Sequence, residues 1–191
     1  MNVLVVDNYD SFTYNLVHYV ESFLSQPDTL KVLRNDEVNV NDIAKYDKII
    51  LSPGPGLPKE AHNLLAIVEK SVKLQKQLLG VCLGHQAIAQ YFGASLLNLQ
   101  HPFHGVDSVM RVIADSILYL HLPKKIKVGR YHSWVVDNKQ FPQQLVIDGI
   151  DEQNRIMSFH HQYLPVFGVQ YHPESILTNE GKEIIRNFLQ I

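Results

Sequence analysis

Residues 78–86 read Leu78-Leu79-Gly80-Val81-Cys82-Leu83-Gly84-His85-Gln86, an apolar run that stops at a cysteine held between two glycines. Cys82 is the only cysteine in the chain. A helical pattern follows it, so the stretch predicts a strand, a sharp turn and a helix, as in a nucleophile elbow with sulfur in place of the serine oxygen. Glycines are expected there because the turn strains the backbone and brings neighbouring chain too close for a β-carbon.

Such an elbow would give Cys82 a chemical role. Unpaired N–H groups and the positive end of the dipole at a helix start favour a thiolate. The backbone N–H of Leu83, the residue after the nucleophile, would be placed to donate to an oxyanion. The alternative is an inert core residue, which is the usual role of a lone cysteine after an apolar run. The two glycines and the helix start favour the nucleophile.

Length and composition narrow the classes of function. The 191 residues are enough for a sizeable core, and we expect a single domain over residues 1–191. Seventeen basic and nineteen acidic residues give a formal charge of −2, so neither nucleic acid nor an anionic membrane is an expected partner. One cysteine cannot form an internal disulfide, and the first residues do not resemble a signal peptide. No apolar run approaches the ~18 residues of a membrane span, and we expect a cytoplasmic protein.

The first half of the chain alternates between two kinds of element. A continuous β-branched run at residues 2–7 predicts a strand buried on both faces, and further short strands alternate with amphipathic helices after it. The strands are expected at residues 2–7, 30–33 and 48–51, and the helices at about 12–23 and 61–74, with residues 8–11 supplying a turn and a helix cap. This alternation predicts a parallel sheet with its sites at the carboxyl ends of the strands.

One of these carboxyl ends is followed by Ser52-Pro53-Gly54-Pro55-Gly56-Leu57-Pro58. Its three prolines prevent regular pairing, and its two glycines allow the backbone to approach a ligand. The alternative is a rigid connector. The loop and Cys82 are predicted to lie at the same edge of the sheet.

The second half predicts short, mostly antiparallel strands. They are expected at residues 95–99, 109–113, 128–136, 145–147 and 155–159, followed by a buried strand at 167–171 and an amphipathic helix at 179–191. The predicted fold class is therefore α/β, with an open mostly parallel sheet flanked by helices and an additional small antiparallel sheet region in the second half.

A thiol nucleophile needs a base and usually a third group that orients the base. His172 follows the buried strand at 167–171, and Glu174 lies two residues further on. Residues at this spacing can share a face, so the carboxylate could hold the imidazole in the required tautomer. The pattern leaves the choice of base open among the ten histidines of the chain.

The other histidines are weaker candidates. His160 and His161 would point to opposite faces of a strand, so at most one of them could act. His101 and His104 flank a loop that has no cysteine or carboxylate cluster, so a metal site there is not favoured.

Six motifs, in this order, resemble the triad-type (class I) glutamine amidotransferases. They are Asp7-Asn8-Tyr9-Asp10-Ser11-Phe12-Thr13-Tyr14-Asn15-Leu16, Arg34-Asn35-Asp36, Ser52-Pro53-Gly54-Pro55-Gly56, Gly80-Val81-Cys82-Leu83-Gly84-His85-Gln86, Arg130-Tyr131-His132-Ser133 and Gln170-Tyr171-His172-Pro173-Glu174-Ser175. The first motif is most similar to the chorismate-pathway branch, the small subunits of anthranilate synthase and aminodeoxychorismate synthase.

The resemblance implies that Cys82 attacks L-glutamine to form a γ-glutamyl thioester, with His172 as base and Glu174 orienting it. It implies an oxyanion hole formed by the N–H groups of Gly54 and Leu83. The residues that it implies for glutamine binding are Gly54, Pro55, Gly56 and Gln86, with the backbone of Ser133 and Trp134.

The resemblance also implies a larger, chorismate-binding synthase subunit that receives the ammonia, either anthranilate synthase component I or aminodeoxychorismate synthase component I. It implies no cofactor and no metal in this chain, and magnesium in the synthase partner. Where the family commonly has His-Gly-Lys, this chain has His104-Gly105-Val106, a departure that affects the surface expected to face the partner.

Two other functions stay open. A free-standing thiol hydrolase of γ-glutamyl compounds could use the same elbow and triad without a partner. A catalytically silent regulatory subunit is a further alternative, against which the intact Cys82, His172 and Glu174 argue. The residues do not distinguish tryptophan from folate synthesis, because ammonia is the same product in both.

Overall fold

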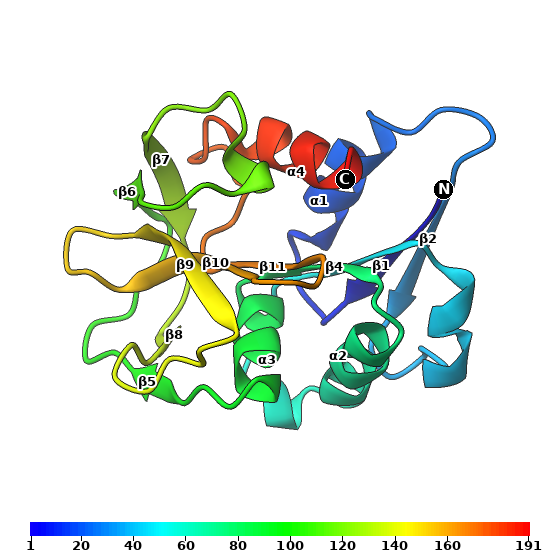
Figure 1. Ribbon diagram of the computed structural model, residues 1–191, viewed down its shortest axis with the longest axis horizontal. Coiled ribbons are helices and arrows are strands. Elements are labelled where there is room, and N and C mark those ends of the chain that lie inside the picture. Colours follow the sequence, from blue (N-terminus) through cyan, green and yellow to red (C-terminus); the bar gives the residue numbers. More distant parts are fainter.

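The computed structural model describes the whole chain, residues 1–191 (Figure 1). The strands are β1 (Asn2–Asp7), β2 (Thr29–Arg34), β3 (Lys48–Leu51), β4 (Gln77–Val81), β5 (Leu96–Asn98), β6 (Val106–Val112), β7 (Lys125–Arg130), β8 (Trp134–Val136), β9 (Leu145–Ile150), β10 (Ile156–His161) and β11 (Val166–Val169). The α-helices are α1 (Thr13–Glu21), α2 (Leu64–Lys73), α3 (Leu83–Tyr91) and α4 (Gly181–Leu189). Three short 3-10 helices are η1 (Val40–Lys45), η2 (Pro58–Glu60) and η3 (Ile117–Tyr119).

The main sheet has nine strands in the order β2-β1-β3-β4-β11-β10-β9-β6-β7. The strands from β2 to β11 pair in parallel, and those from β11 to β7 continue the sheet in antiparallel pairing. A second, two-stranded sheet pairs β5 with β8. The predicted α/β fold, with its mostly parallel sheet and its antiparallel region in the second half, is confirmed. None of the helices combines the length and apolar character needed to cross a membrane.

Helices cover both faces of the parallel half, with α1 and α4 on one side and α2 and α3 on the other (Figure 1). The side chains of β1 show why both faces of the sheet need covering. Val3 and Val5 pack in the core with residues of α1 and α4, whereas Leu4 and Val6 pack in the core with residues of α2 and α3. Successive strand residues point to opposite faces, so a continuously apolar strand buries both of them. This leaves the carboxyl edge of the sheet, rather than a face, for a site.

The prediction of one strand over residues 128–136 is wrong, because this segment forms β7 and β8, which lie in different sheets. The break falls at residues 131–133. The carbonyl of His132 accepts the N–H of Phe103 at 3.0 Å, and the carbonyl of Ser133 accepts the N–H of Leu99 at 2.7 Å. These hydrogen bonds tie residues 131–133 to the segment after β5, so the backbone leaves the main sheet there.

Two predicted helix starts also differ in detail. Helix α2 begins at Leu64 instead of 61, because residues 58–60 first form η2. Helix α1 has Phe12 as its N-cap residue, without a side-chain cap. The turn before it still contributes, since the Asp10 carboxylate accepts the backbone N–H of Phe12 at 2.8 Å.

Candidate active site

Cys82 occupies the turn between β4 and α3, as the sequence predicts for an elbow. Its backbone angles are φ 51° and ψ −97°, a region that costs free energy for any residue with a side chain. The neighbouring strand holds it there, because the N–H of Cys82 donates to the carbonyl of Val169 at 2.8 Å. Cys82 is only 6% exposed, so a substrate would react with it inside a pocket.

The two glycines of the elbow are required by close packing. A β-carbon on Gly80 would lie 2.4 Å from the carbonyl carbon and oxygen of Gly84. A β-carbon on Gly84 would lie 2.6 Å from the β-carbon of Leu51 in the adjacent strand β3. The first turn of α3 therefore packs directly against the backbone of β3 and β4. Its N–H groups, which have no partners inside the helix, lie beside Cys82.

His172 and Glu174 follow β11 and form the predicted pair. Nδ1 of His172 lies 2.7 Å from Oε1 of Glu174, and both side chains are buried. Burial lowers the pKa of His172, but the nearby Cys82 sulfur and the Glu174 carboxylate outweigh it, so the pKa is raised well above its usual value. Nε2 of His172 makes no hydrogen bond with oxygen or nitrogen groups of the chain. It is therefore available to exchange a proton with Cys82.

Aromatic rings shield this pair from solvent. The ring of Tyr131 lies 4.9 Å from the His172 ring, and the ring of Phe12 lies 6.4 Å from it, both edge-on. The backbone of His172 is fixed as well, since its N–H donates to the carbonyl of Gly129 at 3.0 Å. The base is thus held rigidly in a site with little access to bulk water.

The proline-glycine loop packs directly against the elbow. A β-carbon on Gly54 would lie 2.5 Å from the carbonyl oxygen of Asn8 and 2.8 Å from a methyl carbon of Leu83. Asn8 anchors the loop, because its side-chain amide donates to the carbonyl of Ser52 at 2.7 Å and its backbone N–H donates to the Ser52 hydroxyl at 2.8 Å. The loop is therefore part of the site and is not a remote connector.

A small cavity of about 140 Å³ brings the predicted binding residues together. It is lined by Gly54, Pro55, Gly56, Cys82, Leu83, Gln86, Tyr131, His132, Ser133 and Trp134. Gln86 is held in this lining by a hydrogen bond, since its side-chain amide donates to the carbonyl of Trp134 at 2.9 Å. Tyr131 and His132 also line the cavity; their sequence pattern predicts no such role, although both belong to the motif Arg130-Tyr131-His132-Ser133.

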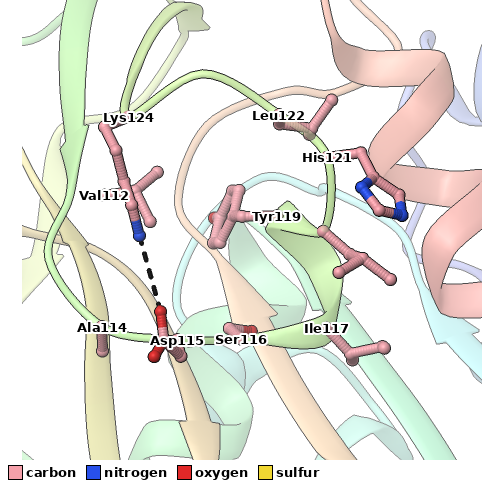
Figure 2. Close-up of a pocket in the computed structure, with 10 residues that line it drawn as sticks. Val112, Ala114, Asp115, Ser116, Ile117, Tyr119, His121, Leu122 and Lys124 are labelled. Carbon is pink, nitrogen blue, oxygen red and sulfur yellow. Dashed lines mark ion pairs between the residues drawn. The ribbon is translucent and has the colours of Figure 1, made fainter.

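Larger hollows elsewhere in the molecule are not lined by Cys82, His172 or Glu174. A larger one, of about 480 Å³, lies around η3 and shares no lining residue with the Cys82 pocket (Figure 2). Its charged residues are Asp115 and Lys124, which form an exposed ion pair at 3.5 Å. It contains no pairing of a nucleophile with a base, so the smaller cavity is the candidate active site.

The competing histidines have structural partners elsewhere. Nδ1 of His160 lies 2.5 Å from Oδ1 of Asp148. His161 accepts the backbone N–H groups of Tyr163 and Leu164. Val106, the departure in the loop motif, is the first residue of β6, is 47% exposed and does not line the Cys82 pocket.

Comparison with known proteins agrees with this geometry. The family described as glutamine amidotransferase class-I matches residues 4–191. Anthranilate synthase component 2 of Saccharolobus solfataricus is 42% identical, over 97% of this chain and 96% of that protein. Aminodeoxychorismate/anthranilate synthase component 2 of Bacillus subtilis is 39% identical, over 98% of this chain and 95% of that protein. A solved glutamine amidotransferase from Thermotoga maritima has the same fold, with a TM-score of 0.78 at 16% identity, over 100% of this chain and 96% of that one. This chain therefore belongs to the class I glutamine amidotransferase family.

Proposed function

We propose that this chain is the glutaminase subunit of a chorismate-aminating synthase. It hydrolyses glutamine through a thioester on Cys82 and passes the ammonia to a separate synthase subunit. The observation that carries the proposal is the strained, buried Cys82 beside the His172–Glu174 pair. Cys82 lies in a cavity that is also lined by residues 54–56 and 131–134. We place this activity in one domain formed by residues 1–191.

The first half of the reaction forms the thioester. Nε2 of His172 takes the thiol proton of Cys82, and the resulting thiolate, paired with the imidazolium, attacks the side-chain carbonyl of glutamine. The N–H groups of Leu83 and Gly54 stabilise the negative oxygen of the tetrahedral intermediate. The intermediate collapses when His172 protonates the amine, and ammonia leaves.

The second half consumes one water. His172 takes a proton from the water, which attacks the thioester carbonyl, and the new intermediate expels the Cys82 thiolate and glutamate. The sum is glutamine plus water giving glutamate plus ammonia. A nucleophile, an oriented base and N–H donors are sufficient for this chemistry, so we propose that the chain uses no metal or cofactor of its own.

The Gly54→Ala variant tests the oxyanion hole. The added β-carbon would clash with the Asn8 carbonyl and the Leu83 side chain, so the loop must move and its N–H must leave its position. Loss of one such donor lowers kcat by roughly 10²–10³-fold. Glutamate release at saturating glutamine measures this effect, and Asn138→Ala, a small change at an exposed position, is the control. An unchanged kcat in the Gly54→Ala variant would show that the Gly54 N–H is not part of the oxyanion hole.

A separate partner is supported by the names of the relatives, which are second components of anthranilate and aminodeoxychorismate synthases. The partner that these names suggest is a first component that binds chorismate. Both pathways remain candidates, because one of the relatives carries both names.

Reconstitution with the synthase tests the function. We expect little glutamate release from the isolated chain and at least a ~10-fold rise with the correct synthase subunit and chorismate, because a partner can fix the proline-glycine loop in its active conformation. Each candidate synthase is assayed for anthranilate or aminodeoxychorismate with glutamine and with ammonium salts. The correct one becomes glutamine-dependent only when this chain is added. Equal glutaminase rates with and without every synthase would instead favour a free-standing hydrolase.

A further inference from the structure

Gln170 is a fully buried residue to which the proposed reaction assigns no role. It follows β11, two residues before His172, and its side-chain nitrogen Nε2 lies 3.5 Å from the sulfur of Cys82. An amide N–H at this distance donates weakly to a thiol and more strongly to a thiolate, because hydrogen bonds to charged acceptors are stronger. The orientation of the Gln170 amide therefore matters, since its oxygen in the same place would repel the sulfur anion.

The partners of Gln170 determine this orientation. Oε1 of Gln170 accepts a hydrogen bond from Nε2 of Gln86 at 3.1 Å. The same nitrogen of Gln86 donates to the carbonyl oxygen of Trp134 at 2.9 Å. A carbonyl oxygen can only accept, so Gln86 must present its NH₂ group on that side, and its second hydrogen then points to Gln170. Gln170 must accept with its oxygen, which leaves its NH₂ facing Cys82.

A buried ion pair fixes the other end of this chain of hydrogen bonds. Nη1 of Arg130 lies 2.8 Å from Oδ2 of Asp151, and both side chains are buried. Nε of Arg130 donates to Nε2 of His132 at 3.2 Å, and Nδ1 of His132 lies 3.0 Å from the Trp134 carbonyl. Arginine has only donors, so Nε2 of His132 must accept and Nδ1 must carry the proton.

His132 stays neutral in this arrangement. Burial and the adjacent Arg130 charge lower the pKa of His132 to about 3. The imidazole therefore keeps one tautomer across the working pH range. The guanidinium of Arg130 is also confined, because its central carbon lies 3.5 Å from the centre of the Phe103 ring. The donors and acceptors of the hydrogen bonds that run from Asp151 to the Trp134 carbonyl are therefore fixed.

We propose that Gln170 is a further catalytic residue, whose amide N–H stabilises the Cys82 thiolate, and that Asp151, Arg130 and His132 are positioning residues that hold the Trp134 carbonyl, which orients Gln86 and through it the Gln170 amide. The thiolate forms twice in each turnover, once before attack and once when the thioester is hydrolysed. In the thioester the sulfur is neutral and accepts more weakly. The Gln170 N–H therefore stabilises the two states in which the Cys82 sulfur is negatively charged more than it stabilises the thioester.

The kinetic part of this inference rests on the proposed glutaminase function, but its central test does not. Cys82 is the only cysteine, so the rate of alkylation by iodoacetamide reports on this sulfur alone. We expect Gln170→Leu to raise the pH midpoint of the alkylation profile by about one unit, the shift that corresponds to loss of one hydrogen bond to a charged group. Gln170→Glu should raise it further, because a carboxylate faces the sulfur.

The matched control is Gln162→Leu, which makes the same change at an exposed glutamine and should leave the midpoint unchanged. His132→Phe removes the donor to the Trp134 carbonyl. We expect it to raise the midpoint by less than Gln170→Leu and to raise KM for glutamine several-fold, because the Trp134 backbone lines the pocket. Circular dichroism and thermal unfolding identify the folded variants, and the comparison is made among these.

The outcomes separate the two proposals. A folded Gln170→Leu or Gln170→Glu protein with an unchanged midpoint would overturn the role of Gln170, whatever its glutaminase activity. The midpoint could rise in these variants although the unmodified chain makes none of the synthases dependent on glutamine. That result would support the role of Gln170 and contradict the proposed function. An unchanged midpoint in folded His132→Phe would overturn the positioning role.

Discussion

Replacing Cys82 with serine is expected to abolish glutamine-dependent synthesis by the assembled enzyme, by at least about 10³-fold, while ammonia-dependent synthesis continues. The thioester route needs a sulfur that is both a strong nucleophile at neutral pH and a good leaving group, and a serine oxygen is neither. Serine fits the same buried turn, so the fold and the docking of the partner should be preserved. Product formation with glutamine and with ammonium salts is measured on the same preparation.

The ammonia-dependent rate is the control for this substitution, because it reports whether the complex still assembles and whether the synthase still works. A second control is Ser22→Ala, a loss of one exposed hydroxyl at the end of α1, which should change neither rate. If Cys82→Ser retained most of its glutaminase rate, the nucleophile would have to be another group. If both rates were lost together, Cys82 would be needed for assembly instead of chemistry.

The sequence predicts correctly those features of the fold and the site that are determined by residues close together in the chain. Strand β3 lies at residues 48–51 as predicted, because the apolar run Ile49-Ile50-Leu51 is too short for a helix and is buried on both faces as a strand. The elbow is predictable because Gly80, Cys82 and Gly84 are neighbours in the chain. The pairing of His172 with Glu174 follows from their spacing at the end of a strand.

Sequence patterns miss those features that depend on contacts between segments far apart in the chain. Residues 128–136 have the pattern of one strand, and only hydrogen bonds to Leu99 and Phe103 show that the chain turns at residues 131–133. The contact between the elbow and His172 depends on the parallel pairing of β4 with β11, which aligns Val81 with Val169. The orientation of Gln170 depends on partners in several other segments, so no local pattern could have identified its role.

His172→Asn is expected to be about as damaging as Cys82→Ser, because the base and the nucleophile act as one unit and the loss of either removes the proton transfer. Glu174→Gln should cost ~10²-fold or less, since the amide oxygen can still accept from Nδ1 of His172. Glutamate release by the complex at saturating glutamine gives the order of the two effects. Asn138→Ala, at an exposed position, is the control for damage to the fold.

The pH dependence separates an orienting role of Glu174 from a structural one. The Cys82 sulfur and the Glu174 carboxylate raise the pKa of His172, against the lowering effect of burial. Removing the carboxylate charge destabilises the imidazolium, so the pKa of His172 falls and its proton is lost at a lower pH. The alkaline limb of kcat/KM for glutamine should therefore move to lower pH in Glu174→Gln, and it should stay in place in Glu152→Gln, which removes an exposed carboxylate. A Glu174→Gln enzyme as inactive as His172→Asn, or one with an unmoved alkaline limb, would mean that Glu174 supports the fold and does not tune the base.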